Sequence, residues 1–234
     1  MILAIIPARG GSKRIPKKNI KSFLGQPIIN YSIAAAIQSG IFDKVIVSTD
    51  SEEIKSVAIK GGADVPFMRP TNLATDESST AVVLSHAVKW FQNHGHNVEH
   101  FCCIYPTAPL LNPSFIRDGY NLITSEKVAS VFSVATFPYP IQRALKLNES
   151  GGLEMFWPEY ENRLSNYLEE SYHDAGQFYW LNTDRFLTTG KLFSSDALPI
   201  VLPRYLVQDI DTPEDWDTAE RLFRALQSQS RELR

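Results

Sequence analysis

Six cationic side chains lie close together near the N-terminus, in a loop that contains two adjacent glycines: Arg9, Lys13, Arg14, Lys17, Lys18 and Lys21. No acidic residue precedes Asp43. Gly10 and Gly11 would let backbone N–H groups approach a phosphate, while Ser12 and the cations bind and neutralise it. The spacing matches neither a Walker A loop nor G-x-G-x-x-G. A polyphosphate site is the functional interpretation, and a solvated basic turn is the alternative.

Two carboxylates near the C-terminus have the spacing of a metal site. Asp209 and Asp211 are two residues apart, so on an extended segment both side chains lie on one face. Mg²⁺ prefers one or two carboxylates together with substrate phosphates. A magnesium ion there, opposite the cationic loop, would suit triphosphate chemistry. The alternative is that both residues belong to a solvated turn before a helix.

A third candidate region, residues 171–180, mixes hydrogen-bonding groups with aromatic rings. Its polar members are His173, Asp174 and Gln177, and Tyr179 adds a ring that carries a hydroxyl. Sugar pockets need donors and acceptors for hydroxyl groups and flat apolar walls for the ring faces. The stretch therefore favours a sugar site, with an ordinary strand as the alternative.

Two further segments are less specific. One runs from Arg69 through a polar loop to Ser79 and Thr80, and the other places Tyr105 and Thr107 at the end of an apolar strand. Either segment would fit a ligand crevice, or simply a helix cap and a turn. A metal cluster of His94, His96 and His100 is not expected, because nothing fixes their geometry.

The elements that must position these residues alternate between strand and helix. Apolar runs predict strands at 2–6, 45–48, 65–67, 101–105 and 128–134. Helical patterns occupy 28–37, the stretch after Asp50 as N-cap, 82–91, the stretch after Asn112 and the stretch after Thr212 as N-cap. This order predicts an α/β fold with a mostly parallel sheet between two helical layers. Ligands bind at the carboxyl ends of strands in such sheets, which is where the cationic loop lies.

Bulk properties restrict the class of protein. With 234 residues we expect one unit over 1–234, carrying an inserted arm of short strands at about 137–170, where the periodicity breaks down. A net charge of −3 argues against nucleic acid as a partner. The two cysteines are adjacent and unsuited to a disulfide, and no stretch resembles a signal peptide or membrane span. We expect a cytoplasmic protein with no membrane partner.

The stretch 6–20, IPARGGSKRIPKKNI, closely resembles the opening motif of the acylneuraminate cytidylyltransferases, the CMP-sialic acid synthetase family. Further matches follow in family order at 48–50, 69–70, 73–74, 79–80, 106–109 and 209–212. The resemblance implies a nucleotide-diphospho-sugar transferase-like fold of three layers and a homodimer with a small dimerisation arm. Its implied partners are CTP and an acidic nine-carbon sugar.

Residue by residue, the resemblance implies these roles. The CTP triphosphate would be held by Arg9, Gly10, Gly11, Ser12, Lys13 and Lys18, and the cytidine by Asn19, Arg69, Ser79 and Thr80. Asp209 and Asp211 would carry magnesium. Arg9, Lys13, Lys18 and Asp211 would be the catalytic set, as the sugar's anomeric hydroxyl attacks the α-phosphate and pyrophosphate leaves.

The sequence departs from the sialic acid branch at two places. Tyr105 precedes Pro106-Thr107-Ala108-Pro109 where that branch usually has Gln, and the run 173–180 resembles the pseudaminic acid branch. The implied sugar is therefore pseudaminic acid, contacted by Tyr105, Thr107, His173, Asp174, Gln177 and Tyr179. N-acetylneuraminate and legionaminate remain alternatives, as does a non-catalytic nucleotide sensor. RNA binding through the basic loop is disfavoured by the net charge.

Overall fold

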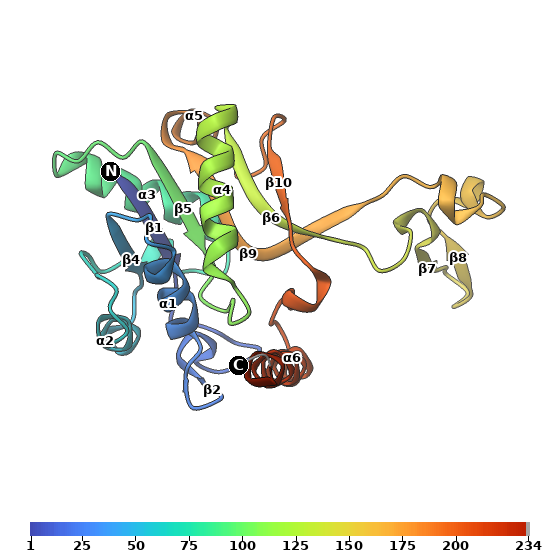
Figure 1. The fold of residues 1–234 in the computed structure, drawn as a ribbon, viewed down its shortest axis with the longest axis horizontal. Helices are drawn as coiled ribbons and strands as arrows, with labels where there is room; N and C mark the ends of the chain where they lie inside the picture. The colour runs from blue at the N-terminus through green and yellow to red at the C-terminus, as the bar shows by residue number, and fades with distance from the viewer. Residues whose placement is uncertain (233–234) are drawn as a thin grey trace.

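One six-stranded sheet organises the chain in the computed structural model, which describes residues 1–232 (Figure 1). Its order is β10–β6–β9–β5–β1–β4, and β9 is antiparallel to both of its neighbours while the other pairs are parallel. The strands are β1 (Ile2–Pro7), β4 (Lys44–Ser48), β5 (His100–Ile104), β6 (Ser130–Thr136), β9 (Tyr172–Asn182) and β10 (Leu198–Val201). This confirms the mostly parallel sheet.

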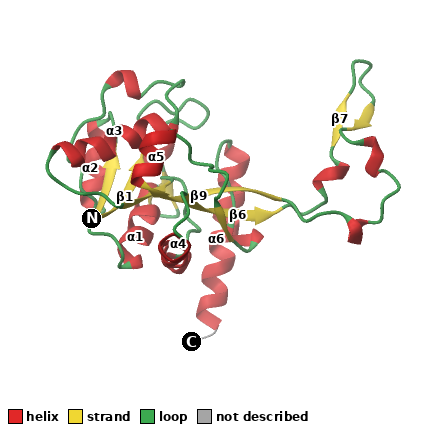
Figure 2. Ribbon diagram, turned by 90° about the horizontal axis from the view of Figure 1, so that it is seen from above, coloured by secondary structure: helices red, strands yellow, loops and turns green. Residues whose placement is uncertain are grey.

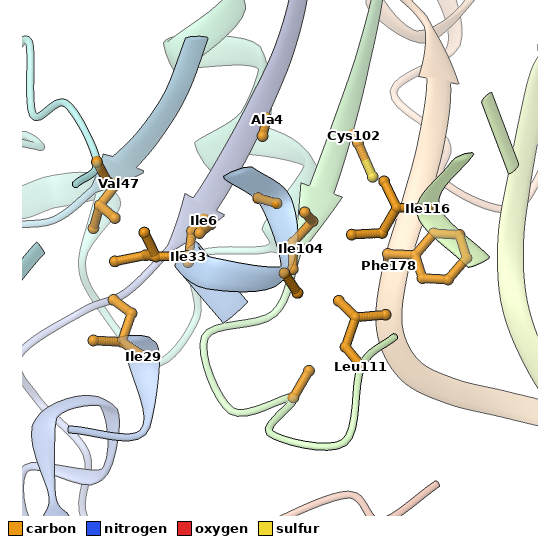
Figure 3. Packing of buried hydrophobic residues seen from close by; sticks show 14 of the residues in the cluster. Ala4, Ile6, Ile29, Ile33, Val47, Cys102, Ile104, Leu111, Ile116 and Phe178 are labelled. Atoms are coloured by element: carbon orange, nitrogen blue, oxygen red, sulfur yellow. The ribbon is translucent and has the colours of Figure 1, made fainter. Parts of the chain in front are cut away.

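Helices cover both faces of this sheet, so the fold has three layers. On one face, α1 (Ile29–Ser39), α2 (Glu52–Lys60) and α4 (Pro113–Glu126) bury Ile33, Ala58 and Ile116 against the strands. Figure 3 shows this packing around Ile6, Ile104 and Phe178. The opposite face is covered by α3 (Thr80–Asn93) and α5 (Thr183–Thr189). The two cores bury the apolar residues that the strand and helix patterns predict.

The strand directions place several loops next to one another along one edge of the sheet. Strands β1, β4, β5, β6 and β10 run the same way, so their carboxyl ends lie along one edge. The loops at 8–21, 49–51 and 105–112 leave from that edge, as does the segment 202–212 after β10. Strand β9 begins there, because it runs in the opposite direction.

An arm projects from the same edge, between the end of β6 and the start of β9 (Figures 1 and 2). It contains the hairpin of β7 (Leu145–Leu147) and β8 (Leu153–Met155), which is a separate two-stranded sheet. Several large apolar side chains are exposed on it, among them Tyr139, Leu147, Leu153, Leu164 and Tyr167. This is the segment for which the sequence predicts an arm of short strands.

A third, smaller core joins the C-terminal helix to the N-terminal loop. The helix α6 (Pro213–Glu232) packs Trp216 and Ala219 onto Ile15, Ile210 and Phe23, the last of which lies in the hairpin of β2 (Ser22–Phe23) and β3 (Gln26–Pro27). The rings of Phe23 and Trp216 meet edge to face, 5.5 Å apart. This core fixes the cationic loop and the Asp209–Asp211 segment relative to each other.

Three helix ends are formed by residues that commonly begin or end helices, and one predicted N-cap is wrong. Gly40 ends α1 in the left-handed conformation, and the Asn112 side chain caps α4 ahead of Pro113. Thr212 and Asp215 form a reciprocal capping box, with N–H to oxygen distances of 3.2 and 2.7 Å. The cap predicted for Asp50 is wrong, because Ser51 caps α2 instead.

The strand predicted at 65–67 is also wrong. Isolated bridges at Asp64 and Met68 join this segment to β4 and to Thr49 without forming a ladder between them. Six short 3₁₀ helices complete the elements, at Lys18–Ile20, Thr71–Leu73, Ile141–Arg143, Pro158–Tyr160, Ser165–Tyr167 and Arg204–Leu206. Among the described residues, no helix combines the length and apolar character needed to cross a membrane.

Candidate active site

A cavity of about 420 Å³ opens at the carboxyl edge of β1, β4 and β5. Five cationic and two acidic side chains contribute to its lining, together with neutral polar and apolar groups. The lining residues are Pro7, Arg9, Ser12, Lys13, Arg14, Ile15, Lys18, Asn19, Arg69, Asp76, Ser78, Thr80, Val83, Tyr105, Pro106, Thr107 and Asp211. A surplus of positive charge in a concave site favours a polyanionic ligand.

The loop after β1 is held in shape by its own polar contacts. Asn19, which is buried, donates its side-chain amide to the carbonyl of Arg9 (2.9 Å), closing the loop on itself. The N–H of Gly10 donates to Asp50 Oδ1 (2.9 Å), which ties the loop to the segment after β4. A methyl group at Gly10 would lie 3.2 Å from the Ser51 Cβ, so the close approach at this position favours glycine.

Arg69 places a buried cation in the cavity wall. Its Nε donates to Ser48 Oγ (3.1 Å) and its Nη2 donates to the Ser48 carbonyl. Burial lowers the pKa of Arg69 to about 10, so the guanidinium stays protonated at neutral pH. Arg69 therefore lines the cavity, and its contact with the cytidine stays a prediction.

Asp76 enters the cavity from the loop before α3 and contacts two cations of the opposite wall. Its Oδ1 lies 2.8 Å from Arg9 Nη1 and its Oδ2 lies 2.5 Å from Lys13 Nζ. The ammonium group of Lys13, together with Arg9, lowers the pKa of the Asp76 carboxyl. Asp76 was not among the predicted site residues, because nothing in its local sequence distinguishes it from a solvated loop acid.

Asp211 pairs with two other cations of the N-terminal loop. Its Oδ1 lies 2.8 Å from Arg14 Nη2 and 3.3 Å from Lys18 Nζ, and the Lys18 ammonium also donates to the Ile210 carbonyl. Lys18 and Asp211, which the resemblance places in one catalytic set, are therefore in contact. Arg14 was not among the predicted site residues, although its position in the basic run could have indicated it.

Asp209 and Asp211 are close enough to influence each other. Desolvation, followed by the negative charge of Asp211, raises the pKa of Asp209. A cation between two such carboxylates relieves both the desolvation and the repulsion. The donor set, two hard oxygen ligands beside a cavity for an anion, fits Mg²⁺. No cluster of three or more His, Cys, Asp or Glu side chains suited to a metal occurs among the side chains that the structure describes, those of residues 1–228.

A bulge in β9 lies beside these aspartates. The register against β6 shifts between Phe132 and Val134, which pair with Tyr179 and Asp174 respectively. Gly176, at φ +62°, makes this turn, and a Cβ added there would lie 3.8 Å from Asp209 Oδ1. The irregular backbone therefore brings Asp174 close to Asp209. The negative charge of Asp174 also raises the pKa of Asp209.

Asp174 is held in a fixed orientation by two donors. The Gly176 N–H donates to Oδ1 (2.9 Å) and the Tyr179 hydroxyl donates to Oδ2 (2.6 Å). Tyr179 is buried, which raises the pKa of its hydroxyl, and its ring lies 5.2 Å from that of Tyr105. The Tyr105 hydroxyl lies beside those of Thr80 and Tyr179, so a polar chain links the cavity to Asp174.

The predicted residues thus fall into three groups. Seven predicted CTP ligands, Arg9, Ser12, Lys13, Lys18, Asn19, Arg69 and Thr80, line the cavity with Tyr105, Thr107 and Asp211. Gly10, Gly11 and Ser79 do not line it, and Ser79 caps α3 through Val82. His173, Asp174, Gln177, Tyr179 and Asp209 lie outside the lining, on β9 and the segment after β10.

Gln177 and Tyr179 face the interior. Gln177 is 3 % exposed and donates to the Leu206 carbonyl, while its Oε1 has no hydrogen-bond partner within the part of the chain that the structure describes. His173 contacts the ring of Phe137 edge to face at 5.1 Å, at the base of the arm. The three side chains therefore differ in accessibility, although the sequence places them in one polar run.

Comparisons with known proteins identify the family. A family model described as cytidylyltransferase matches residues 3–146. The chain is 45% identical over 222 residues, 95% of its length and 96% of the relative's, to the pseudaminic acid cytidylyltransferase of Campylobacter jejuni. It is 33% identical, over 95% of its length and 96% of the relative's, to the CMP-N,N'-diacetyllegionaminic acid synthase of Legionella pneumophila.

A solved structure supports the fold. The structure of CMP:2-keto-3-deoxy-manno-octonic acid synthetase complexed with CTP covers 98% of this chain and 99% of its own, with a TM-score of 0.69 at 16% identity. At that identity the likeness shows the fold alone. The three-layer architecture predicted from the sequence is therefore confirmed.

Proposed function

The chain belongs to the cytidylyltransferase family, and from this premise we propose that it transfers CMP from CTP to pseudaminic acid and releases pyrophosphate. One observation carries the proposal: the cationic loop and Asp211 line the same cavity, although they come from opposite ends of the chain. A triphosphate needs the cations, and its activation needs a metal-binding carboxylate close to them. The choice of sugar rests on the 45% identity over nearly the whole chain.

In the proposed mechanism the protein binds and orients CTP and neutralises the charge of its phosphates. Arg9 and Lys13 hold the terminal phosphates and stabilise the leaving pyrophosphate, with Gly10, Gly11 and Ser12 nearby. Lys18, which is largely shielded from solvent, serves the α-phosphate beside Asp211. Arg69, Asn19, Ser79 and Thr80 form the cytidine end. These assignments follow the motif, and the positions of all but the two glycines and Ser79 in the cavity wall support them.

Asp209 and Asp211 are the residues that would hold a metal ion. Cytidylyltransferases of this kind generally use a divalent metal, and we propose Mg²⁺ for this chain. When bound, the ion would polarise the α-phosphate towards attack by the sugar's anomeric hydroxyl. Asp211 would then exchange its ion pairs with Arg14 and Lys18 for the metal ion, which would leave those two cations for the substrate phosphates.

For the sugar, we propose direct contacts from Tyr105, Thr107, His173 and Asp174, and a supporting role for Gln177 and Tyr179. The last two are buried, and Tyr179 already uses its hydroxyl to hold Asp174. A carboxylate fixed in this way is a strong acceptor for hydroxyl or amide donors of the sugar. The change of role for Gln177 and Tyr179 follows from their burial.

We further propose a cytoplasmic homodimer. CTP and the reducing environment suited to two free buried cysteines are both cytoplasmic. The exposed apolar side chains of the arm would be covered by a second copy of the chain. In a monomer these apolar side chains would stay exposed to water, which is unfavourable.

The test is pyrophosphate release with Mg²⁺ and CTP, offering pseudaminic acid, N-acetylneuraminate and N,N'-diacetyllegionaminate in parallel. Release with pseudaminic acid alone is expected. Release with only another of these sugars would retain the cytidylyltransferase and overturn the sugar assignment. Binding of CTP with no release from any sugar would favour a nucleotide sensor over an enzyme.

A further inference from the structure

The cations proposed to hold the terminal phosphates are already bridged by a carboxylate of the protein. Asp76 offers one oxygen to Arg9, at 2.8 Å, and the other to Lys13, at 2.5 Å. A phosphate group would present its oxygens to two cations in the same manner. The carboxylate therefore occupies a position that a phosphate of the substrate needs.

The loop that carries Asp76 is ordered by contacts within itself. It runs between the 3₁₀ helix at Thr71–Leu73 and the start of α3, and the Ser78 hydroxyl bonds to Thr75 Oγ1 (2.9 Å) and to the Asn72 carbonyl (3.3 Å). Ser79 then caps α3 through the Val82 N–H. These contacts lie on either side of Asp76 and direct it across the cavity to Arg9 and Lys13.

We propose that Asp76 is an internal competitor for the terminal phosphates: it bridges Arg9 and Lys13 in the ligand-free enzyme and is displaced when a triphosphate binds. This inference rests on the proposed function, since it concerns the CTP site. Two anions cannot share the same pair of cations without repulsion, so each binding event must break both ion pairs. Asp76 therefore weakens the binding of CTP and promotes the release of pyrophosphate.

The charge balance of the cavity supports this role. Arg14 and Lys18 are paired with Asp211, so Asp76 accounts for the remaining two loop cations in the lining. Asp76 is half exposed, and its loop is free of the buried core that fixes Asp211. Its displacement requires a local movement of an exposed loop and leaves the sheet undisturbed.

The experiment measures binding of CTP, pyrophosphate and CMP by calorimetry to the full-length enzyme and its variants in Mg²⁺. Asp76→Asn is expected to bind CTP and pyrophosphate roughly threefold to tenfold more tightly, the range for two exposed ion pairs. CMP, which lacks the terminal phosphates, is expected to bind unchanged. The pyrophosphate inhibition constant should fall by the same factor as its dissociation constant.

Glu77→Gln is the matched control, because it removes the same charge one residue along the loop. Glu77 is exposed and has no ion pair with the described side chains of residues 1–228. It is expected to leave all three affinities within about twofold of wild type. Asp76→Ser, which also lacks the charge, should reproduce the Asp76→Asn result and so guards against an effect of the amide.

Three results would overturn the inference: unchanged or weaker pyrophosphate binding by Asp76→Asn, an equal gain for CMP, or an equal gain from Glu77→Gln. In each case wild-type binding of CTP would leave the proposed function standing. Absence of CTP binding by folded wild-type protein would instead reject the proposed function, and the inference with it.

Discussion

At the scale of the residue, the site consists of charges that are already paired before any ligand arrives. Arg14 and Lys18 share Asp211, while Arg9 and Lys13 share Asp76. Mutual repulsion of four cations in one cavity would otherwise spread the loop. The pairing therefore keeps the cations close together, and it makes ligand binding an exchange of anionic partners.

The first prediction concerns Asp211. Asp211→Asn is expected to lower turnover about a hundredfold or more, because it removes a carboxylate proposed to bind the metal at the reacting phosphate. Pyrophosphate release at saturating CTP measures this. The control is Asp217→Asn, which removes an exposed acid on α6 away from the cavity and should keep wild-type turnover. Turnover of Asp211→Asn within about threefold of wild type would reject the metal role.

At the scale of the element, the small core under α6 positions the two halves of the site. Ile15 lies next to Arg14 in the chain and Ile210 next to Asp211, and both isoleucines are buried in this core. The Arg14–Asp211 ion pair is therefore set by the apolar contacts behind it. The same core holds Lys18, whose ammonium donates to the Ile210 carbonyl.

The second prediction removes part of this core. Ile210→Ala is expected to lower the free energy of unfolding by about 2–5 kcal/mol, the usual cost of a cavity left by a fully buried isoleucine. Urea denaturation measures this, with Ile59→Ala, 53 % exposed on α2, as the control expected to change it by less than about 0.5 kcal/mol. The affinity for CTP should fall in Ile210→Ala and stay unchanged in the control Ile59→Ala. Equal stability losses for the two variants would contradict the buried anchor.

The third prediction concerns the contact of α4 with β9. A Cβ at Gly119 would lie 2.7 Å from Trp180 Cδ1 and 3.1 Å from Phe178 Cε2. Both rings are fully buried, so Gly119→Ala is expected to destabilise the fold by about 1–3 kcal/mol in urea denaturation despite the better helix propensity of alanine. Ser125→Ala, on the exposed side of the same helix, should show no loss. A stabilised Gly119→Ala variant would show that the helix can move away from the sheet.

At the scale of the whole molecule, the arm is the feature that a single chain does not explain. Leu147 and Leu153 are cross-strand neighbours on its hairpin and are 71 % and 68 % exposed. A two-stranded hairpin with exposed leucines is marginal by itself. Burial against a second copy would supply the missing apolar contact.

The fourth prediction tests that assembly. Wild-type protein is expected to be a dimer in light scattering coupled to size exclusion, and the double variant Leu147→Lys with Leu153→Lys is expected to be a monomer. The control carries the same two changes on the body, at Ile37 and Ile59, which are about half exposed on α1 and α2. A dimer that survives the arm substitutions would place the interface elsewhere.

The sequence by itself determined the features that depend on near neighbours. The apolar run at 2–6, the Thr212–Asp215 capping box and the Asn112–Pro113 helix start each depend on contacts within a few residues. The alternation of such elements then fixed the class of fold, since few layer arrangements bury them all. The cationic loop could be predicted as a polyphosphate site for a similar reason, because its residues are close together in the sequence.

The tertiary structure alone decided which charges meet. Lys13 and Asp76 are 63 residues apart, and Lys18 and Asp211 are 193 apart, so no local pattern pairs them. Asp50 is another example. The local sequence predicts a helix cap, but β4 pairs with β1, and the Asp50 carboxylate therefore accepts a hydrogen bond from the Gly10 N–H. The bulge that brings Asp174 near Asp209 likewise depends on the register of β9 against β6. These contacts are set by strand pairing in the sheet and by the core under α6, both of which join residues regardless of their separation along the chain.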